Sequence, residues 1–196
     1  LFRSWTGQQY TARCYTDIIP LLGTEELADG RLPYLEPCEG TQPQCDEYPV
    51  VTMYAMRVAA WIDDGLAGFF LVNVAFLAIA ALGVVVLLHR SVGDRALYVA
   101  AAPTLMAYAY MNWDLLAVVA ATAASVLALR RRDGWAGILF GIGVAAKLYP
   151  GLLLAAFLLE RRRERDARGA GRLAAGAAGS WLALNLPFAD RKSTRL

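Results

Sequence analysis

Lys147 stands out first, because it is the only charged residue in an apolar stretch that runs from Gly134 to Leu159. A stretch of this length is typical of a membrane-embedded segment. A lysine inside a membrane helix costs about 2.5–3.5 kcal/mol, so Lys147 should face protein or water and have a partner. Asp114 could be that partner in a structural ion pair. A fixed cation in a low-dielectric site can also stabilise negative charge on a substrate.

The stretch around Lys147 allows two interpretations. One straight helix would cross the bilayer and place the flanking arginines, at positions 130–132 on one side and 161–163 and 165 on the other, on opposite sides of the membrane. A hairpin broken at residues 147–150 would keep both clusters in the cytoplasm, as the positive-inside rule favours, and Pro150 interrupts a helix at that point. Each arm would be about 13 residues, roughly 20 Å, which is too short to cross a core of about 30 Å. The hairpin is favoured, with its turn lining a cavity at membrane depth.

Further polar groups are expected at the same depth. Asn112-Trp113-Asp114 separates two apolar runs, residues 96–111 and 115–129. The far end of each run meets a basic, cytoplasmic connection, at Arg95 and at Arg130. These three residues should therefore point outward. The first 66 residues hold ten acids against four arginines, and Asn185 ends a last apolar run. The convergence of polar groups on the outer side indicates a membrane enzyme working on the outer leaflet. A transporter, in which broken helices and a buried lysine are equally natural, is the alternative.

The composition predicts an all-α, polytopic transmembrane helical bundle. Of the 196 residues, 58% are hydrophobic and 18% charged, and the mean hydropathy is +0.41. Such values are typical of integral membrane proteins, and the basic clusters match cytoplasmic loops rather than a nucleic-acid surface. The expected regions are an extracytoplasmic loop (1–66), a transmembrane helical region (67–188) and an unstructured tail (189–196). Within them we expect a short helix in 16–29 with Thr24 as N-cap, an interfacial helix over 47–62 with Pro49 in its first turn, and a spanning helix over 67–88.

The cysteines and the chain ends carry less information. Cys14, Cys38 and Cys45 all lie in the acidic N-terminal part. If that part is outside the cytoplasm, a Cys38–Cys45 disulfide could form, and unpaired thiols are the alternative. No metal-ligand spacing is present. The chain starts without an initiator methionine and is expected to be a fragment of a longer protein.

Five short motifs, taken in order, resemble glycosyltransferase family 87, whose members are polytopic GT-C-type enzymes that use polyprenyl-phosphate-mannose and related lipid-linked sugars. They are Cys14-Tyr15-Thr16-Asp17-Ile18, Glu47-Tyr48-Pro49-Val50, Asn112-Trp113-Asp114-Leu115-Leu116-Ala117, Ala145-Ala146-Lys147-Leu148-Tyr149-Pro150 and Asn185-Leu186-Pro187. The resemblance covers residues 14 to about 188.

The resemblance implies a role for each site residue. Asp17 matches the first-loop acid that acts as general base, and Lys147 is the candidate for stabilising the departing lipid phosphate. The implied substrate-binding residues are Glu47, Tyr48, Asn112, Asp114, Lys147 and Tyr149. The implied partners are a polyprenyl-phosphate sugar, a glycolipid or glycan acceptor and membrane lipids, with no cofactor, at the outer face of a bacterial cell membrane. Structural alternatives are a solvated acid or helix cap for Asp17, a cap for Glu47, and packing for Tyr149 and Trp113.

Overall fold

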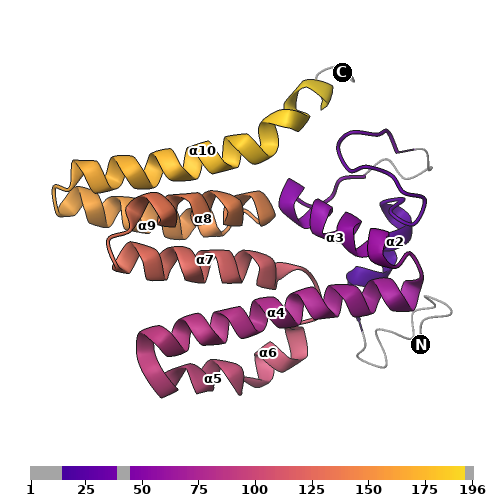
Figure 1. The fold of residues 1–196 in the computed structure, drawn as a ribbon, viewed down its shortest axis with the longest axis horizontal. Coiled ribbons are helices and arrows are strands. Elements are labelled where there is room, and N and C mark those ends of the chain that lie inside the picture. The colour runs from indigo at the N-terminus through magenta and orange to yellow at the C-terminus, as the bar shows by residue number, and fades with distance from the viewer. Residues whose placement is uncertain (1–14, 39–44, 193–196) are drawn as a thin grey trace.

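The computed structural model describes residues 15–38 and 45–192, and every regular element in these ranges is helical (Figure 1). The predicted all-α fold class is confirmed. One stretch, Leu66–Ala100, is long and apolar enough to cross a membrane, and Val50–Ile62, Asp114–Leu129 and Asp133–Ala146 are shorter apolar helices.

Two short helices from the N-terminal part lie at one end of the bundle. They are α2 (Ile18–Thr24) and α3 (Val50–Ile62), and both pack against α4. The predicted N-cap role of Thr24 is wrong, because Thr24 ends α2 and its hydroxyl donates back to the carbonyl of Pro20 at 3.3 Å. Asp17 occupies the N-cap position without a capping hydrogen bond from its side chain. Pro49 is the N-cap of α3, one position before the first turn in which it was expected.

The predicted spanning helix is present and longer than expected. Helix α4 (Leu66–Val92) ends at Gly93, whose φ of 65° suits glycine. The apolar run over residues 96–111 then breaks into a 3-10 turn, η1 (Gly93–Ala96), and the helices α5 (Leu97–Ala100) and α6 (Pro103–Tyr108). Pro103 is the first residue of α6, where its missing N–H removes no helical hydrogen bond.

The hairpin around Lys147 is confirmed. Helices α7 (Asp114–Leu129), α8 (Asp133–Ala146), α9 (Pro150–Arg163) and α10 (Ala167–Lys192) run alternately up and down the bundle (Figure 1). The helical backbone stops at Ala146 and resumes at Pro150, so both arginine clusters lie at the same end of the bundle. Helix α10 continues to Lys192, so residues 189–192 of the predicted unstructured tail (189–196) are helical, and residues 193–196 lie outside the described part of the chain.

Small residues let α8 and α10 approach closely. A Cβ atom added at Gly176 would lie 2.6 Å from the carbonyl oxygen of Gly134, and one at Gly137 or Gly141 would meet the α10 backbone. The hydroxyl of Ser180 donates to the carbonyl of Ile138 at 2.9 Å across the same contact. Small residues at a helix contact are the usual device in membranes, where packing replaces the hydrophobic drive.

A buried arginine ties the basic end together. Arg161 is 1% exposed; it donates to the carbonyl of Ala128 at 2.6 Å and to Oδ1 of Asp133 at 2.8 and 3.1 Å. Arg131, in the neighbouring connection, donates to Glu164 at 2.6 Å. The two connections are therefore bound to each other. Arg161 is thus buried inside the protein, although its position in an arginine cluster beside a connection would suit a surface residue.

Candidate functional site

An open pocket of about 950 Å³ lies at the opposite end of the bundle from the arginine clusters. Its lining comes from three segments: α2 with the residues just before it, the residues before α3, and the α8–α9 turn. The lining residues are Tyr15, Asp17, Pro20, Leu21, Thr24, Glu47, Tyr48, Pro49, Lys147, Leu148 and Tyr149. Of the predicted site residues, the pocket therefore brings together Asp17, Glu47, Tyr48, Lys147 and Tyr149.

Asp17 is held by its neighbours in the chain and by the loop before α7. Its backbone N–H donates to the carbonyl of Met111 at 2.8 Å, and the hydroxyl of Thr16 donates to the carbonyl of Tyr110 at 2.9 Å. The hydroxyl of Tyr15 donates to Oδ1 of Asp17. The carboxylate thus sits half-buried at the pocket wall, on a backbone anchored to a distant segment. Its second oxygen can accept a proton from a bound group.

Lys147 lies in the hairpin turn and contacts an acid and an aromatic ring. Its Nζ donates to Oδ1 of Asp114, the first residue of α7, which confirms the predicted ion pair. Nζ also lies 5.7 Å from the centroid of the Tyr48 ring, within the range of a cation–π contact. The Lys147 side chain remains 34% exposed, so it is open to the pocket while paired. The Tyr149 hydroxyl lies 3.4 Å from the Asp114 carbonyl as a long hydrogen bond.

The turn is fixed against α3 by a residue that the sequence did not single out. The buried hydroxyl of Thr52 donates to the carbonyl of Ala146, the last residue of α8, at 2.8 Å. This carbonyl precedes the break in the helix and would otherwise lack a partner. Thr52 therefore couples α3 to the backbone that carries Lys147. A lone threonine in an apolar helix gives no signal for such a contact.

Asn112 and Trp113 have structural roles. Asn112 Oδ1 accepts a hydrogen bond from the N–H of Asp114 at 3.0 Å, and Asn112 does not line the pocket. Trp113 is 2% exposed and donates from Nε1 to Oδ1 of Asn73 at 2.7 Å. Its ring packs edge-on against Tyr48 at 5.5 Å, so it supports the pocket from behind. This agrees with the packing interpretation of Trp113.

Asp114 and Asn185 lie outside the pocket lining. Asp114 reaches the pocket through Lys147, and it lines a second, smaller pocket of about 510 Å³. That pocket lies beside α6 and is mostly apolar, with Tyr98, Val99, Ala102, Thr104, Leu105, Tyr108, Ala109 and Leu115 in its wall. Asn185 is half-buried on α10 and donates to the carbonyl of Trp181 at 2.8 Å, so it has a local partner.

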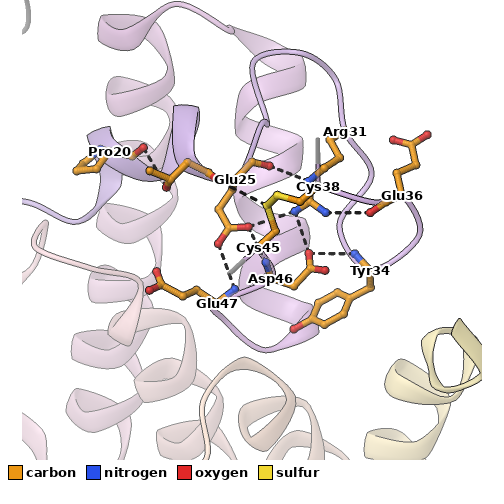
Figure 2. Close-up of a disulfide and its surroundings, with 10 residues drawn as sticks. Pro20, Glu25, Arg31, Tyr34, Glu36, Cys38, Cys45, Asp46 and Glu47 are labelled. Carbon is orange, nitrogen blue, oxygen red and sulfur yellow. Dashed lines mark hydrogen bonds and ion pairs between the residues drawn. A yellow bond between two sulfur atoms is a disulfide. The ribbon is translucent and has the colours of Figure 1, made fainter. Parts of the chain in front are cut away.

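A buried ionic cluster stands behind Glu47 (Figure 2). Glu25, 1% exposed, accepts hydrogen bonds from the N–H groups of Asp46 and Glu47 at 2.7 and 3.1 Å. Arg31, 5% exposed, donates to Glu25 at 3.2 Å and to Asp46 at 2.9 Å. Burial raises the pKa of Glu25, opposed by these hydrogen bonds and by Arg31. Sequence reasoning missed the cluster, because nothing in the spacing of these residues distinguishes them from other loop charges.

Tyr34 adds a further link from this loop to the pocket. Its hydroxyl donates to the carbonyl of Tyr48, and its backbone N–H donates to Oδ1 of Asp46 at 3.0 Å. Burial raises the pKa of Tyr34 to about 12, so the phenol keeps its proton and stays a donor at ordinary pH. Tyr48 is therefore bound at its carbonyl by Tyr34, while its ring contacts Lys147.

The disulfide considered between Cys38 and Cys45 is formed, so unpaired thiols are the wrong alternative for these two residues. Their sulfur atoms lie near Glu26, but thiols joined in a disulfide are not free to ligate a metal ion. Cys14 lies outside the described residues.

Comparison with known protein families gives a match over most of the chain. The model of the family described as glycosyltransferase family 87 matches residues 47–193. No curated protein and no solved structure matches the chain.

Proposed function

Because this chain belongs to glycosyltransferase family 87, a family of membrane glycosyltransferases, we propose that it transfers a sugar from a polyprenyl-phosphate donor to an acceptor hydroxyl in the pocket around Asp17 and Lys147. The observation that carries the proposal is the convergence of these two residues. They are far apart in the sequence, yet both line one open pocket at the end of the bundle away from the arginines. The family membership does not favour the transporter alternative.

Asp17 is proposed as the general base of an inverting displacement. The acceptor oxygen attacks the anomeric carbon, the bond from that carbon to the phosphate oxygen breaks, and its electron pair goes to the phosphate. The acceptor proton moves to the carboxylate of Asp17. An alcohol is a poor nucleophile until a positioned base takes its proton in the transition state, which is what Asp17 would supply. Its anchored backbone and its place in the pocket wall support this role.

Lys147 is proposed to stabilise the charge on the leaving phosphate. An ammonium group has three N–H donors, and Asp114 accepts one of them, so two remain for phosphate oxygens. The ion pair with Asp114 and the contact with Tyr48 hold the cation in place before the donor binds, as preorganised electrostatic stabilisation requires. Glu47 and Tyr149 would contact the sugars from the remaining walls, and an aromatic face suits a sugar ring.

A lipid-linked donor suits the surroundings better than a soluble nucleotide sugar. The second pocket is lined mostly by apolar side chains from the segment 98–109. Asp114 also lines it and pairs with Lys147 of the charged pocket. A phosphate at Lys147 would then lie beside apolar surface that can accommodate a lipid chain. Mannose is the proposed sugar. The proposed setting of the pocket is the extracytoplasmic face of a bacterial cell membrane, because the arginine-rich connections lie at the other end of the bundle.

The test is Asp17→Asn, which keeps the shape of the side chain and removes the proton acceptor. Loss of a general base lowers the rate by about 10²–10⁴-fold. Transfer is measured from radiolabelled polyprenyl-phosphate-mannose in membranes with matched expression. Binding of the donor should change little, because the base faces the acceptor.

Asp29→Asn is the matched control. Asp29 is an exposed acid of the same loop and does not line the pocket, so its neutralisation should leave transfer near wild type. Asp46, which the sequence alone would offer as a second control, is unsuitable because its side chain binds Arg31 and the N–H of Tyr34. Near wild-type transfer by Asp17→Asn would show that the base lies elsewhere, and Glu47 would be examined next.

A further inference from the structure

Glu25 holds the backbone of two consecutive residues at once. Its two carboxylate oxygens accept the N–H of Asp46 at 2.7 Å and the N–H of Glu47 at 3.1 Å. Glu25 itself is fixed by Arg31, whose guanidinium donates to its carboxylate at 3.2 Å and to its carbonyl at 2.9 Å. Figure 2 shows the Glu25 carboxylate turned toward the backbone of Asp46 and Glu47, with the disulfide beside it. The path of the chain into Glu47 is thus set by a buried side chain.

Asp46 adopts a backbone conformation that requires such support. Its φ is 64°, in the left-handed region that residues other than glycine rarely occupy. Such conformations persist where the surroundings over-determine them. Here the N–H of Asp46 is bound to Glu25, and its carboxylate accepts from Arg31 at 2.9 Å and from the N–H of Tyr34 at 3.0 Å. The turn at Asp46 redirects the chain immediately before Glu47.

The same short helix carries both Asp17, which lines the pocket, and Glu25, which does not. Asp17 is the N-cap of α2 and Glu25 is its C-cap, so the position of Glu25 relative to Asp17 is fixed by one rigid element. Glu47, which Glu25 holds by its N–H, lines the pocket together with Asp17. The Glu47 side chain is exposed and is not itself bound by the cluster. Only its backbone is fixed, so its carboxylate stays free to contact a ligand.

From this geometry we propose that Glu25 is a positioning residue for sugar transfer, which acts through the backbone of Glu47 and places the Glu47 carboxylate in the pocket that Asp17 lines. This inference rests on the proposed function, in which Glu47 contacts the sugar substrates. Glu25 does not line the pocket, so it is not a catalytic residue. Its ionised carboxylate matters because a carboxylate accepts at both oxygens, whereas an amide offers one acceptor oxygen and an NH₂ donor.

The test combines Glu25→Gln with Glu47→Gln in full-chain protein in membranes, assayed by transfer from polyprenyl-phosphate-mannose. Loosening a contacting group can lower turnover by as much as about 10²-fold, so we expect Glu25→Gln to reduce kcat/KM by about 10- to 100-fold. In the Glu47→Gln background, the same change should add less than about 3-fold, because residues that act as one unit are non-additive. Glu25→Asp, which keeps the charge but is one methylene shorter, is the second variant if Glu25→Gln does not fold. Asp29→Asn is the control.

A second measurement tests directly whether Glu25 fixes the backbone of Asp46 and Glu47. Amide hydrogen exchange of Asp46 and Glu47 should speed up at least 10-fold in either Glu25 variant, while amides of α7 and α8 keep their protection. Unchanged exchange would overturn the inference, as would multiplicative losses in the double variant. Faster exchange with unchanged transfer would also overturn it. Absence of transfer by the wild type would refute the proposed function instead, and exchange would still decide whether Glu25 fixes Glu47.

Discussion

Replacing Arg161 by methionine tests the buried ionic contact at the basic end of the bundle. Methionine keeps most of the apolar stem and removes the guanidinium. The matched control is Arg162→Met, because Arg162 is exposed, lies next in the same cluster and carries the same charge. Both variants lower the number of positive charges in this connection by one. Any difference between them therefore reports the contacts of Arg161 and not the charge that sets topology.

The expected loss follows from the groups that Arg161 leaves behind. Its removal leaves the carboxylate of Asp133, 6% exposed, and the carbonyl of Ala128 without these donors. Removing one partner of a buried ion pair costs about 3–5 kcal/mol. Exposed substitutions such as Arg162→Met stay within about 0.5 kcal/mol. At roughly 2–4 °C per kcal/mol for a chain of this size, Arg161→Met should melt about 6–20 °C lower than its control.

The assay is thermal unfolding of the purified protein in detergent, followed by intrinsic fluorescence and by the fraction that remains monodisperse after heating. Adding Asp133→Asn to Arg161→Met should restore at least half of the lost melting temperature, because the stranded carboxylate is then neutral. Melting of Arg161→Met within 2 °C of Arg162→Met, roughly the scale of 1 kcal/mol, would refute the reasoning. It would mean that water or detergent replaces the contacts of Arg161.

Three further predictions concern the pocket end of the bundle and the topology of the chain in the membrane. Lys147→Met should lower transfer while the protein still folds. If the protein instead fails to fold because Asp114 is left unpaired, the double variant Lys147→Met with Asp114→Asn should recover expression. Full transfer by a well-expressed Lys147→Met protein would rule out the phosphate role. Burial raises the pKa of Glu25 above its usual 4.5, so its contribution to stability is full below pH 4.5 and is lost as pH rises through the raised pKa. The melting temperature of the wild type minus that of Glu25→Gln should therefore fall between pH 4.5 and 7, and a flat difference would contradict the assignment. Single cysteines introduced at Asn112 and Arg163 should be labelled from opposite sides of the membrane, and labelling from one side would contradict the proposed topology.

The hairpin and part of the pocket could be predicted from the sequence, because strong local signals fix them. Pro150 cannot continue a helix, Lys147 cannot face lipid, and arginines on both flanks favour one side. These three constraints agree, and the structure breaks the helix at residues 147–149. The ion pair of Lys147 with Asp114 could likewise be anticipated, because a lysine at membrane depth needs a partner and Asp114 was expected at the same depth.

The cluster behind Glu47 and the role of Arg161 could not be predicted in this way. Glu25 was one of ten acids in an acidic loop, and its burial depends on how that loop folds over α4. Arg161 was one of several arginines at a helix end, and only the approach of Ala128 and Asp133 distinguishes it from Arg162. Both cases depend on tertiary contacts that leave no periodicity and no composition signal. The N-cap prediction for Thr24 was wrong because both Asp17 and Thr24 are residue types that cap helices, and α2 begins after Asp17 and ends at Thr24.

The length of α2 imposes a constraint on how this region can change. An α-helix turns about 100° per residue, so a single inserted or deleted residue between Asp17 and Glu25 would rotate one acid by that angle relative to the other. The Asp17 carboxylate would leave the pocket wall, or the Glu25 carboxylate would leave the N–H groups of Asp46 and Glu47. Sequence substitutions on the exposed face of α2 leave this angle unchanged. The helix therefore acts as a fixed-length spacer, in which the number of residues matters more than the identity of those facing solvent.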